Sequence, residues 1–239
     1  MWGSMSMMRE TAYRQIQDAG EKLLQMGINT SHSGNISIRG DADIFITRTG
    51  SRLDRLVESD IIVVPLSEDV QGIASVELPM HRQIYLNTGA KAILHAHPPH
   101  TIVFSLVEDV IYPVDNEAFL FLGEIPVLKP KEVSGSAETG KLLADAFARG
   151  SHIAVIRGHG SFAAGENLEE GLHWTTTLER ACQMAYLLRN LSPFRYREII
   201  RSRQQDIRQR AKPRLSHSSH AKLSDRKPAP ARREIQPKS

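Results

Sequence analysis

Two histidines two residues apart, His95 and His97, close an apolar run and stand directly before the pair Pro98-Pro99. Residues i and i+2 of a β-strand point to the same face, so both imidazoles can approach one ion at about 2.0–2.1 Å. Proline cannot donate a ladder hydrogen bond, so the strand should end at this pair. The sequence therefore predicts a strand over residues 92–97 whose end presents two metal ligands.

A third candidate ligand, His159 in RGHG, follows another apolar run further along the chain. Zinc bound by three neutral imidazoles keeps one position open for water or substrate, which is typical of a catalytic site. Manganese, cobalt and iron are also compatible with this donor set. His81 follows Glu77 by four residues on the same face of an expected helix, and we interpret it as a packing residue rather than a ligand.

The hydrophobic pattern predicts helices and strands that interleave along the chain, which indicates an α/β domain. Apolar residues recur at helical spacing from Arg9 to Met26. Asn167 with Glu170 resembles a capping box that opens a long helix to about Asn190, and Ser75 is the expected N-cap of a shorter one. The remaining elements expected are helices over residues 75–87, 100–106 and 137–148, and strands over residues 44–47, 61–65, 111–114, 125–129 and 153–156.

Charge divides the chain into a slightly acidic body and a basic tail. Residues 195–239 hold 14 Lys+Arg against 4 Asp+Glu, whereas residues 1–194 hold 16 against 23. We expect one domain over residues 9–194, after a disordered extension over residues 1–8. The tail has too little apolar surface to offset its ordering entropy, so we expect it to be largely disordered. It has almost no aromatic side chains for base stacking, so nucleic-acid binding is not expected beyond weak, salt-sensitive contacts.

Cysteine content and apolar run length favour a cytoplasmic protein without membrane contact. Cys182 is the single cysteine, so no intramolecular disulfide can form. Its apolar helical spacing indicates a core position. The N-terminal segment lacks the apolar run of a signal peptide or a membrane span.

Five motifs in a fixed order carry a resemblance to a known family. They cover most of residues 9–190, and the chain resembles the class II aldolase/adducin family, most closely its L-fuculose-phosphate aldolases. The resemblance implies an α/β/α sandwich around a central, mostly antiparallel sheet. It also implies a homotetramer with sites at the subunit interfaces. The motifs are SHSGNISIR, ITRTGS, IASVELPMH, LHAHPPH and IRGHGSFAAG.

The chemistry implied by the resemblance is that of a zinc-dependent aldehyde-lyase. Such an enzyme cleaves a ketose 1-phosphate, such as L-fuculose 1-phosphate or a deoxy-pentulose phosphate, to dihydroxyacetone phosphate and an aldehyde. Cleavage leaves negative charge on the ketone fragment, and a divalent cation stabilises the resulting enediolate. The resemblance makes His95, His97 and His159 the metal ligands. Glu77 is then the acid/base residue, which also touches the metal before substrate binds.

The resemblance assigns the phosphate of the substrate to Asn35, Thr49, Gly50 and Ser75. Glycine lets backbone amides approach an anion, and small hydroxyl or amide side chains complete its hydrogen bonds. In many relatives a second serine follows the first, whereas this chain has Val76. The pocket therefore has one donor fewer.

A second departure concerns the proton donor. Aldolases of the family take it from a tyrosine of a neighbouring subunit, and the alignment places Asn116 at that position. Asparagine cannot transfer a proton at neutral pH. Related dehydratases use a carboxylate in this region, so Glu117 is the candidate replacement and a catalytic residue.

Two other functions remain open. One is a sugar-phosphate dehydratase, decarboxylase or epimerase on the same scaffold. The other is a non-catalytic, adducin-like interaction module, against which the retained histidines and carboxylate argue.

Overall fold

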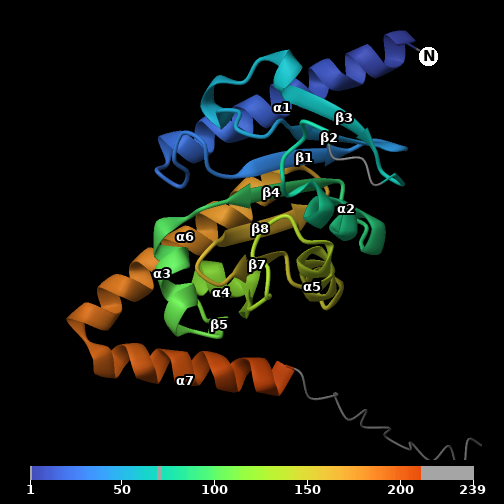
Figure 1. Cartoon of the computed structure of the whole chain (residues 1–239). Helices are drawn as coiled ribbons and strands as arrows, with labels where there is room; N and C mark the ends of the chain where they lie inside the picture. Colours follow the sequence, from blue (N-terminus) through green and yellow to red (C-terminus); the bar gives the residue numbers. More distant parts are fainter. Residues whose placement is uncertain (1, 69–71, 211–239) are drawn as a thin grey trace, which may run out of the picture.

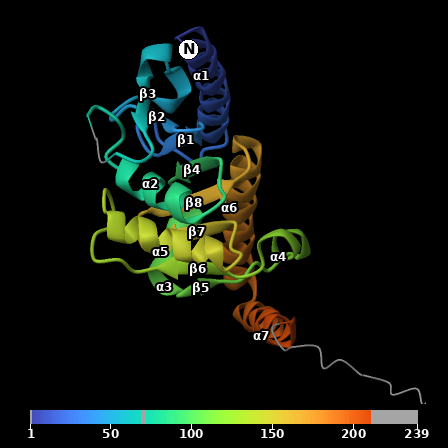
Figure 2. The same ribbon diagram turned by 90° about the vertical axis from the view of Figure 1, so that its right-hand side faces the viewer.

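One sheet runs through the part of the chain that the computed structural model describes, residues 2–68 and 72–210, with side chains from residue 7 on. Its strands are β1 (Asn35–Arg39), β2 (Asp43–Thr47), β3 (Ile61–Pro65), β4 (Ala92–Ala96), β5 (Val110–Ile111), β6 (Ile125–Leu128), β7 (Ile153–Ile156) and β8 (Gly160–Gly165). The strand order is β3-β2-β1-β4-β8-β7-β6-β5 (Figures 1 and 2). Every neighbouring pair is antiparallel except β6 and β7. The predicted, mostly antiparallel sheet is confirmed.

Helices cover both faces of the sheet and give it the predicted α/β/α layering (Figure 2). The α-helices are α1 (Trp2–Gln25), α2 (Leu78–Asn87), α3 (Pro99–Val107), α4 (Asn116–Leu122), α5 (Ala137–Ala148), α6 (Leu168–Leu191) and α7 (Pro193–Arg210), with 3-10 turns at Leu53–Arg55 and Glu58–Asp60. The buried side chains of α2 and α5 pack on one face, whereas those of α1, α3 and α6 pack on the other.

The two central strands are buried on both faces, which explains their uninterrupted small and apolar sequence. In β4, Ile93 joins the cluster under α2 and α5, and its neighbour Leu94 joins the cluster under α1. In β8, Phe162 and Ala163 divide in the same way between the two faces. A polar side chain at the end of these strands is therefore enclosed by helices on both sides.

A glycine sets the approach of α5 to α2. A Cβ atom on Gly140 would lie 2.7 Å from Cα of Met80 and 2.8 Å from Cβ of Gln83. Backbone and side chain of α2 thus occupy the space that any larger residue would need. This contact fixes the position of α5 and of the loop that precedes it.

Some expected boundaries differ from the structure, and four of its described strands and α-helices were not expected: β1, β8, α4 and α7. Strand β1 and helix α4 are short, and β8 is rich in glycine and alanine, so each gives a weak signal in the sequence. Helix α2 begins at Leu78 with Glu77 as its N-cap, not Ser75. The extension expected to be disordered over residues 1–8 is instead helical from Trp2, as the first part of α1.

The basic tail is helical over its first part, which corrects the expectation of disorder from residue 195. Ser192 stands before Pro193, and its hydroxyl accepts a hydrogen bond from the backbone of Arg195 at 3.4 Å, an N-terminal signal for α7. Arginine, glutamine and glutamate, which are good helix formers, dominate α7. The rest of the expected disordered tail, residues 211–239, lies outside the described residues.

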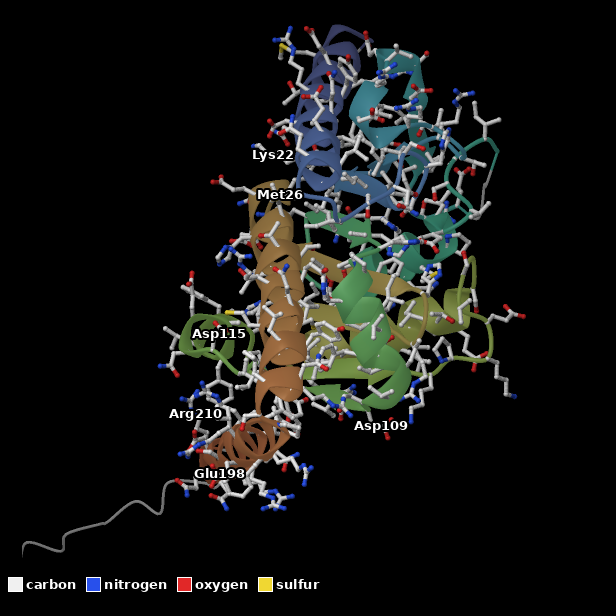
Figure 3. The ribbon with its side chains drawn as sticks, turned by 90° about the vertical axis from the view of Figure 1, so that its left-hand side faces the viewer. Lys22, Met26, Asp109, Asp115, Glu198 and Arg210 are labelled. Atoms are coloured by element: carbon white, nitrogen blue, oxygen red, sulfur yellow. The ribbon has the colours of Figure 1, made fainter. Side chains whose placement is uncertain are left out.

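Helix α7 is held against α4 by arginines (Figure 3). Arg203 donates hydrogen bonds to the backbone oxygen of Val114 at 3.1 Å and to Oδ1 of Asn116 at 2.8 Å. Its guanidinium lies 4.3 Å from the ring centroid of Phe119, and that of Arg210 lies 5.4 Å from the same ring. Charge and cation–π contacts therefore fasten this helix, together with Tyr196, which packs on the apolar cluster under α3 and α6.

Within residues 2–68 and 72–210, no helix is long and apolar enough to cross a membrane.

Replacement of Gly140 by alanine should strain the α2–α5 contact. We expect Gly140→Ala to lower the free energy of unfolding by about 1–3 kcal/mol, the usual cost of overpacking, despite alanine's higher helix propensity. Urea denaturation followed by circular dichroism measures it. Gly89→Ala is the matched control, because a Cβ atom there would meet no atom within 4 Å. Equal stability of both variants would show that the contact is not tight.

Candidate metal centre

Strands β4 and β8 pair in the middle of the sheet (Figure 1). Their pairing brings the three predicted histidines together. His95 is the fourth residue of β4, His97 follows the strand, and His159 stands just before β8. One ligand nitrogen from each ring lies within 4.8 Å of the others. The ring centroids are 4.8–5.0 Å apart. This spacing suits three ligands around one ion.

The hydrogen bonds of His95 determine which nitrogen faces the centre. Nδ1 of His95 lies 2.9 Å from the carbonyl oxygen of Ser161, which can only accept, so Nδ1 carries the proton of the neutral ring. Nε2 therefore presents a lone pair, at 2.9 Å from Nε2 of His97 and 3.2 Å from Oε2 of Glu77. Electron-rich atoms that converge in this way fit a cation such as zinc.

Burial keeps the ligands in their metal-binding form. Burial lowers the pKa of His95, and it lowers the pKa of His97 to about 3, together with the nearby His95 and His159. Both imidazoles are thus neutral at pH 7. Neutral histidine is the form that binds a metal.

Glu77 lies at the centre of the site, 3% exposed at the N-cap of α2. Its Oε1 is 2.8 Å from Nε2 of His159, and its Oε2 accepts a hydrogen bond from Nδ2 of Asn35 at 2.9 Å. Burial alone would raise the pKa of Glu77, but His95 and the hydrogen bonds from His159 and Asn35 lower it below the usual range. The start of α2 also favours the anion. Glu77 is therefore an ionised carboxylate beside the histidines.

Two glycines allow the backbone to approach the histidines closely. A Cβ atom on Gly160 would lie 2.9 Å from Cε1 of His95 and 3.0 Å from Cδ2 of His97. Gly34 has φ +79°, and a Cβ atom there would lie 2.6 Å from the side chain of Asn29. The HG and SGN motifs thus have a steric reason in this fold.

The four residues expected to bind phosphate come from neighbouring segments. Asn35 opens β1 beside Glu77, and Ser75 donates its backbone N–H to the carbonyl of Thr47 at 3.0 Å. The hydroxyl of Thr49 donates to the carbonyl of Ala74 at 2.8 Å. Gly50 follows at the end of β2, with φ +72°. Their function as a phosphate pocket stays a prediction.

Glu117 does not join the histidines within one chain. It lies exposed on the first turn of α4 and lines a cavity of about 550 Å³ with residues of α6. None of the three histidines lines this cavity as the structure describes it. The adjacent Asn116 accepts the hydrogen bond from Arg203. Figure 3 shows the start of α4, marked by Asp115, on the outer side of α6.

Sequence reasoning missed two side chains that contact the site. Oδ1 of Asn29 accepts a hydrogen bond from the backbone of His97 at 2.8 Å. The hydroxyl of Ser134 donates to Oε1 of Glu77 at 2.9 Å. Both stand in loops without regular spacing, so no pattern in the sequence singled them out.

His81 belongs to a buried network behind the site, as the sequence analysis expected. Its Nδ1 lies 2.7 Å from the hydroxyl of Ser37, which is 2.8 Å from the hydroxyl of Tyr85. Burial lowers the pKa of His81 to about 3, so the ring is neutral. Its edge packs on Phe162, whose ring stacks on His95 at 4.1 Å. His81 thus supports the site from behind.

Comparison with known sequences gives matches over most of the folded region. The family profile described as Class II Aldolase and Adducin N-terminal domain matches residues 14–186. An L-fuculose phosphate aldolase of Methanococcus maripaludis (strain C7) is 33% identical over 160 residues, 66% of this chain and 87% of that protein. The L-fuculose phosphate aldolase of Escherichia coli (strain K12) is 25% identical over 181 residues, 74% of this chain and 84% of that protein.

Solved structures give the same picture. The L-fuculose-1-phosphate aldolase of Thermus thermophilus superposes with a TM-score of 0.73 at 35% identity, over 76% of this chain and 96% of that one. YgbL of Klebsiella pneumoniae, described only as a candidate aldolase, epimerase or decarboxylase, superposes with a TM-score of 0.68 at 25% identity, over 75% of this chain and 90% of that one.

Removal of one imidazole should abolish metal binding. We expect the purified protein to hold a divalent ion that His95→Ala loses, because two histidines cannot replace the affinity of three. Mass spectrometry of metals in the dialysed protein measures the content per chain. His152→Ala, which removes an exposed histidine stacked on Trp174, should keep the ion. Full metal content in His95→Ala would contradict the assignment.

Proposed function

Because the chain belongs to the class II aldolase and adducin family, we propose that it is a metal-dependent aldolase of the fuculose-phosphate type. The proposed reaction cleaves a ketose 1-phosphate, such as L-fuculose 1-phosphate or a deoxy-pentulose phosphate, to dihydroxyacetone phosphate and an aldehyde. The observation that carries the proposal is the buried carboxylate of Glu77 in contact with His95 and His159. An acid/base group beside three imidazoles is what this cleavage requires.

The metal proposed is zinc, with manganese or cobalt as compatible substitutes. His95, His97 and His159 would hold it, and Glu77 would touch it before substrate binds. When bound, it supplies positive charge next to the ketone oxygen, where negative charge develops during cleavage to an enediolate. The donor set fits this ion, because the three rings converge on one space and burial keeps His95 and His97 neutral.

The residues of the chain then move the protons and hold the phosphate. Cleavage leaves the electron pair of the broken carbon–carbon bond on the ketone fragment, and Glu77 exchanges the proton at that carbon. Asn35, Thr49, Gly50 and Ser75 orient the phosphate through short side chains and backbone amides. Val76 is exposed at the position where a second hydroxyl would strengthen this contact.

Glu117 is proposed to exchange the proton of the aldehyde oxygen from a neighbouring copy in a homotetramer. Within one chain it stands apart from the histidines, on the outer side of α6. Asn116 cannot act in its place, since an amide transfers no proton at neutral pH and this one accepts from Arg203. A site completed by a second copy would reconcile this position with the chemistry.

Dehydration, decarboxylation or epimerisation is the second candidate. The same histidines and carboxylate serve each reaction, which differ in the fate of the proton. Asn116 and Glu117 favour this alternative, as does the structural similarity to YgbL. A purely structural, adducin-like module is less well supported, since the carboxylate and histidines retain a working arrangement.

Incubation of the metal-loaded protein with L-fuculose 1-phosphate and 5-deoxyribulose 1-phosphate tests the reaction. We expect release of dihydroxyacetone phosphate that a chelator abolishes, measured by a coupled reductase assay. Glu77→Gln should keep its metal and lose turnover by about 10²–10⁴-fold, the usual contribution of acid/base catalysis. Substrate loss without triose phosphate would instead support dehydration, decarboxylation or epimerisation. No turnover of any sugar phosphate would contradict an enzymatic function.

Mixing of two inactive variants tests the contribution of a second copy. Glu77→Gln and Glu117→Gln should each be inactive alone, but random hybrids of a cyclic tetramer leave about a quarter of the sites with both carboxylates. Co-refolding of equal amounts should therefore restore about a quarter of the wild-type rate. Activity that stays at the level of the separate variants would place both carboxylates in one chain or remove Glu117 from the mechanism.

A further inference from the structure

We propose that Ser134, in the loop between β6 and α5, is a positioning residue that holds the Glu77 carboxylate in its working orientation. The inference rests on the proposed function, since Glu77 is the group proposed to move protons. Ser134 lies outside the five sequence motifs, yet its hydroxyl donates to Oε1 of Glu77 at 2.9 Å. Ser134 is exposed and Glu77 is buried, so the hydroxyl closes the solvent side of the carboxylate.

Among the described residues, each oxygen of the Glu77 carboxylate has two polar neighbours. Oε2 lies 2.9 Å from Nδ2 of Asn35 and 3.2 Å from Nε2 of His95. Oε1 lies 2.8 Å from Nε2 of His159 and accepts from Ser134. Each oxygen thus has one imidazole neighbour and one donor that is not an imidazole.

Only the second kind of neighbour can hold the carboxylate while the histidines serve as ligands. A nitrogen that gives its lone pair to a metal carries no proton, so Nε2 of His95 or His159 in that state donates nothing to Glu77. Asn35 and Ser134 then remain as donors among the described contacts, one on each oxygen. Together they fix the plane of the carboxylate, whose terminal torsion is otherwise broad.

The loop that carries Ser134 is braced rather than free. Ser136 caps α5, and its hydroxyl accepts a hydrogen bond from the backbone of Thr139. The hydroxyl of Thr139 in turn donates to the carbonyl of Glu132. Gly135 has φ +68°, and a Cβ atom there would stand 3.1 Å from the carbonyl oxygen of Val76. The turn therefore packs on the residue that precedes Glu77.

The contact between α2 and α5 holds the two segments that carry Glu77 and Ser134. Gly140 on α5 seats its backbone against Met80 on α2, three residues after Glu77. The carboxylate of Glu77 at the start of α2 and the hydroxyl of Ser134 before α5 are therefore held at a fixed distance from each other. Such rigid support is what an acid/base group needs to keep its geometry during turnover.

Kinetics of Ser134→Ala test the role. We expect kcat to fall about tenfold, comparable with the loss of one hydrogen bond to a charged group, while KM and metal content change by less than about twofold. Ser134→Thr, which keeps the hydroxyl, should restore most of kcat. Ser136→Ala is the matched control in the same loop, expected to lower stability through the lost cap but to leave kcat unchanged.

A double-mutant cycle on thermal stability tests the contact without any activity. In the metal-free protein, Ser134→Ala should lower the thermal midpoint when Glu77 is present and have a smaller effect in a Glu77→Ala background. Equal effects in both backgrounds, or an unchanged kcat, would overturn the positioning role. An inactive wild type with an intact cycle would instead reject the proposed function and leave the contact established.

Discussion

The antiparallel pairing of β4 with β8 is the constraint on which the site depends. It sets His95 opposite Phe162 and places His159 beside the end of the neighbouring strand, although 64 positions separate the two histidines in sequence. Burial of both strands on two faces then removes water from His95 and keeps its imidazole neutral. The same pairing that completes the core therefore also brings the candidate ligands together.

Glu77 connects this pair of strands to the rest of the fold. Its backbone begins α2, its carboxylate contacts β1 through Asn35, and Ser134 reaches it from the loop before α5. Burial of a lone carboxylate would be costly, but the hydrogen bonds that Asn35 and Ser134 donate to it offset part of that cost. Side chains from separate segments thus meet at this carboxylate.

Sequence patterns predicted the parts of this structure whose periodicity is strong. The period of two in His95 and His97, the helix Ala137–Ala148 and the strand Ile153–Ile156 agree with the structure. Strand β8 was not predicted because GSFAAG contains few residues with high strand propensity. Ser134 and Asn29 were not predicted for another reason. Both lie in loops that fold against distant segments, and no local spacing in the sequence encodes such a contact.

Helix α7 affects how sequence changes near the end of the described chain should be interpreted. The segment matched by the family profile ends at residue 186, before α7 begins. Arg203 of α7 nevertheless donates hydrogen bonds to Val114 and Asn116 at the start of α4. An alignment limited to the matched segment would leave out these hydrogen bonds. Substitutions of Arg203 or Arg210 would therefore act on α4 from outside the segment that the family profile matches, and a comparison of the matched segments alone would not explain their effects.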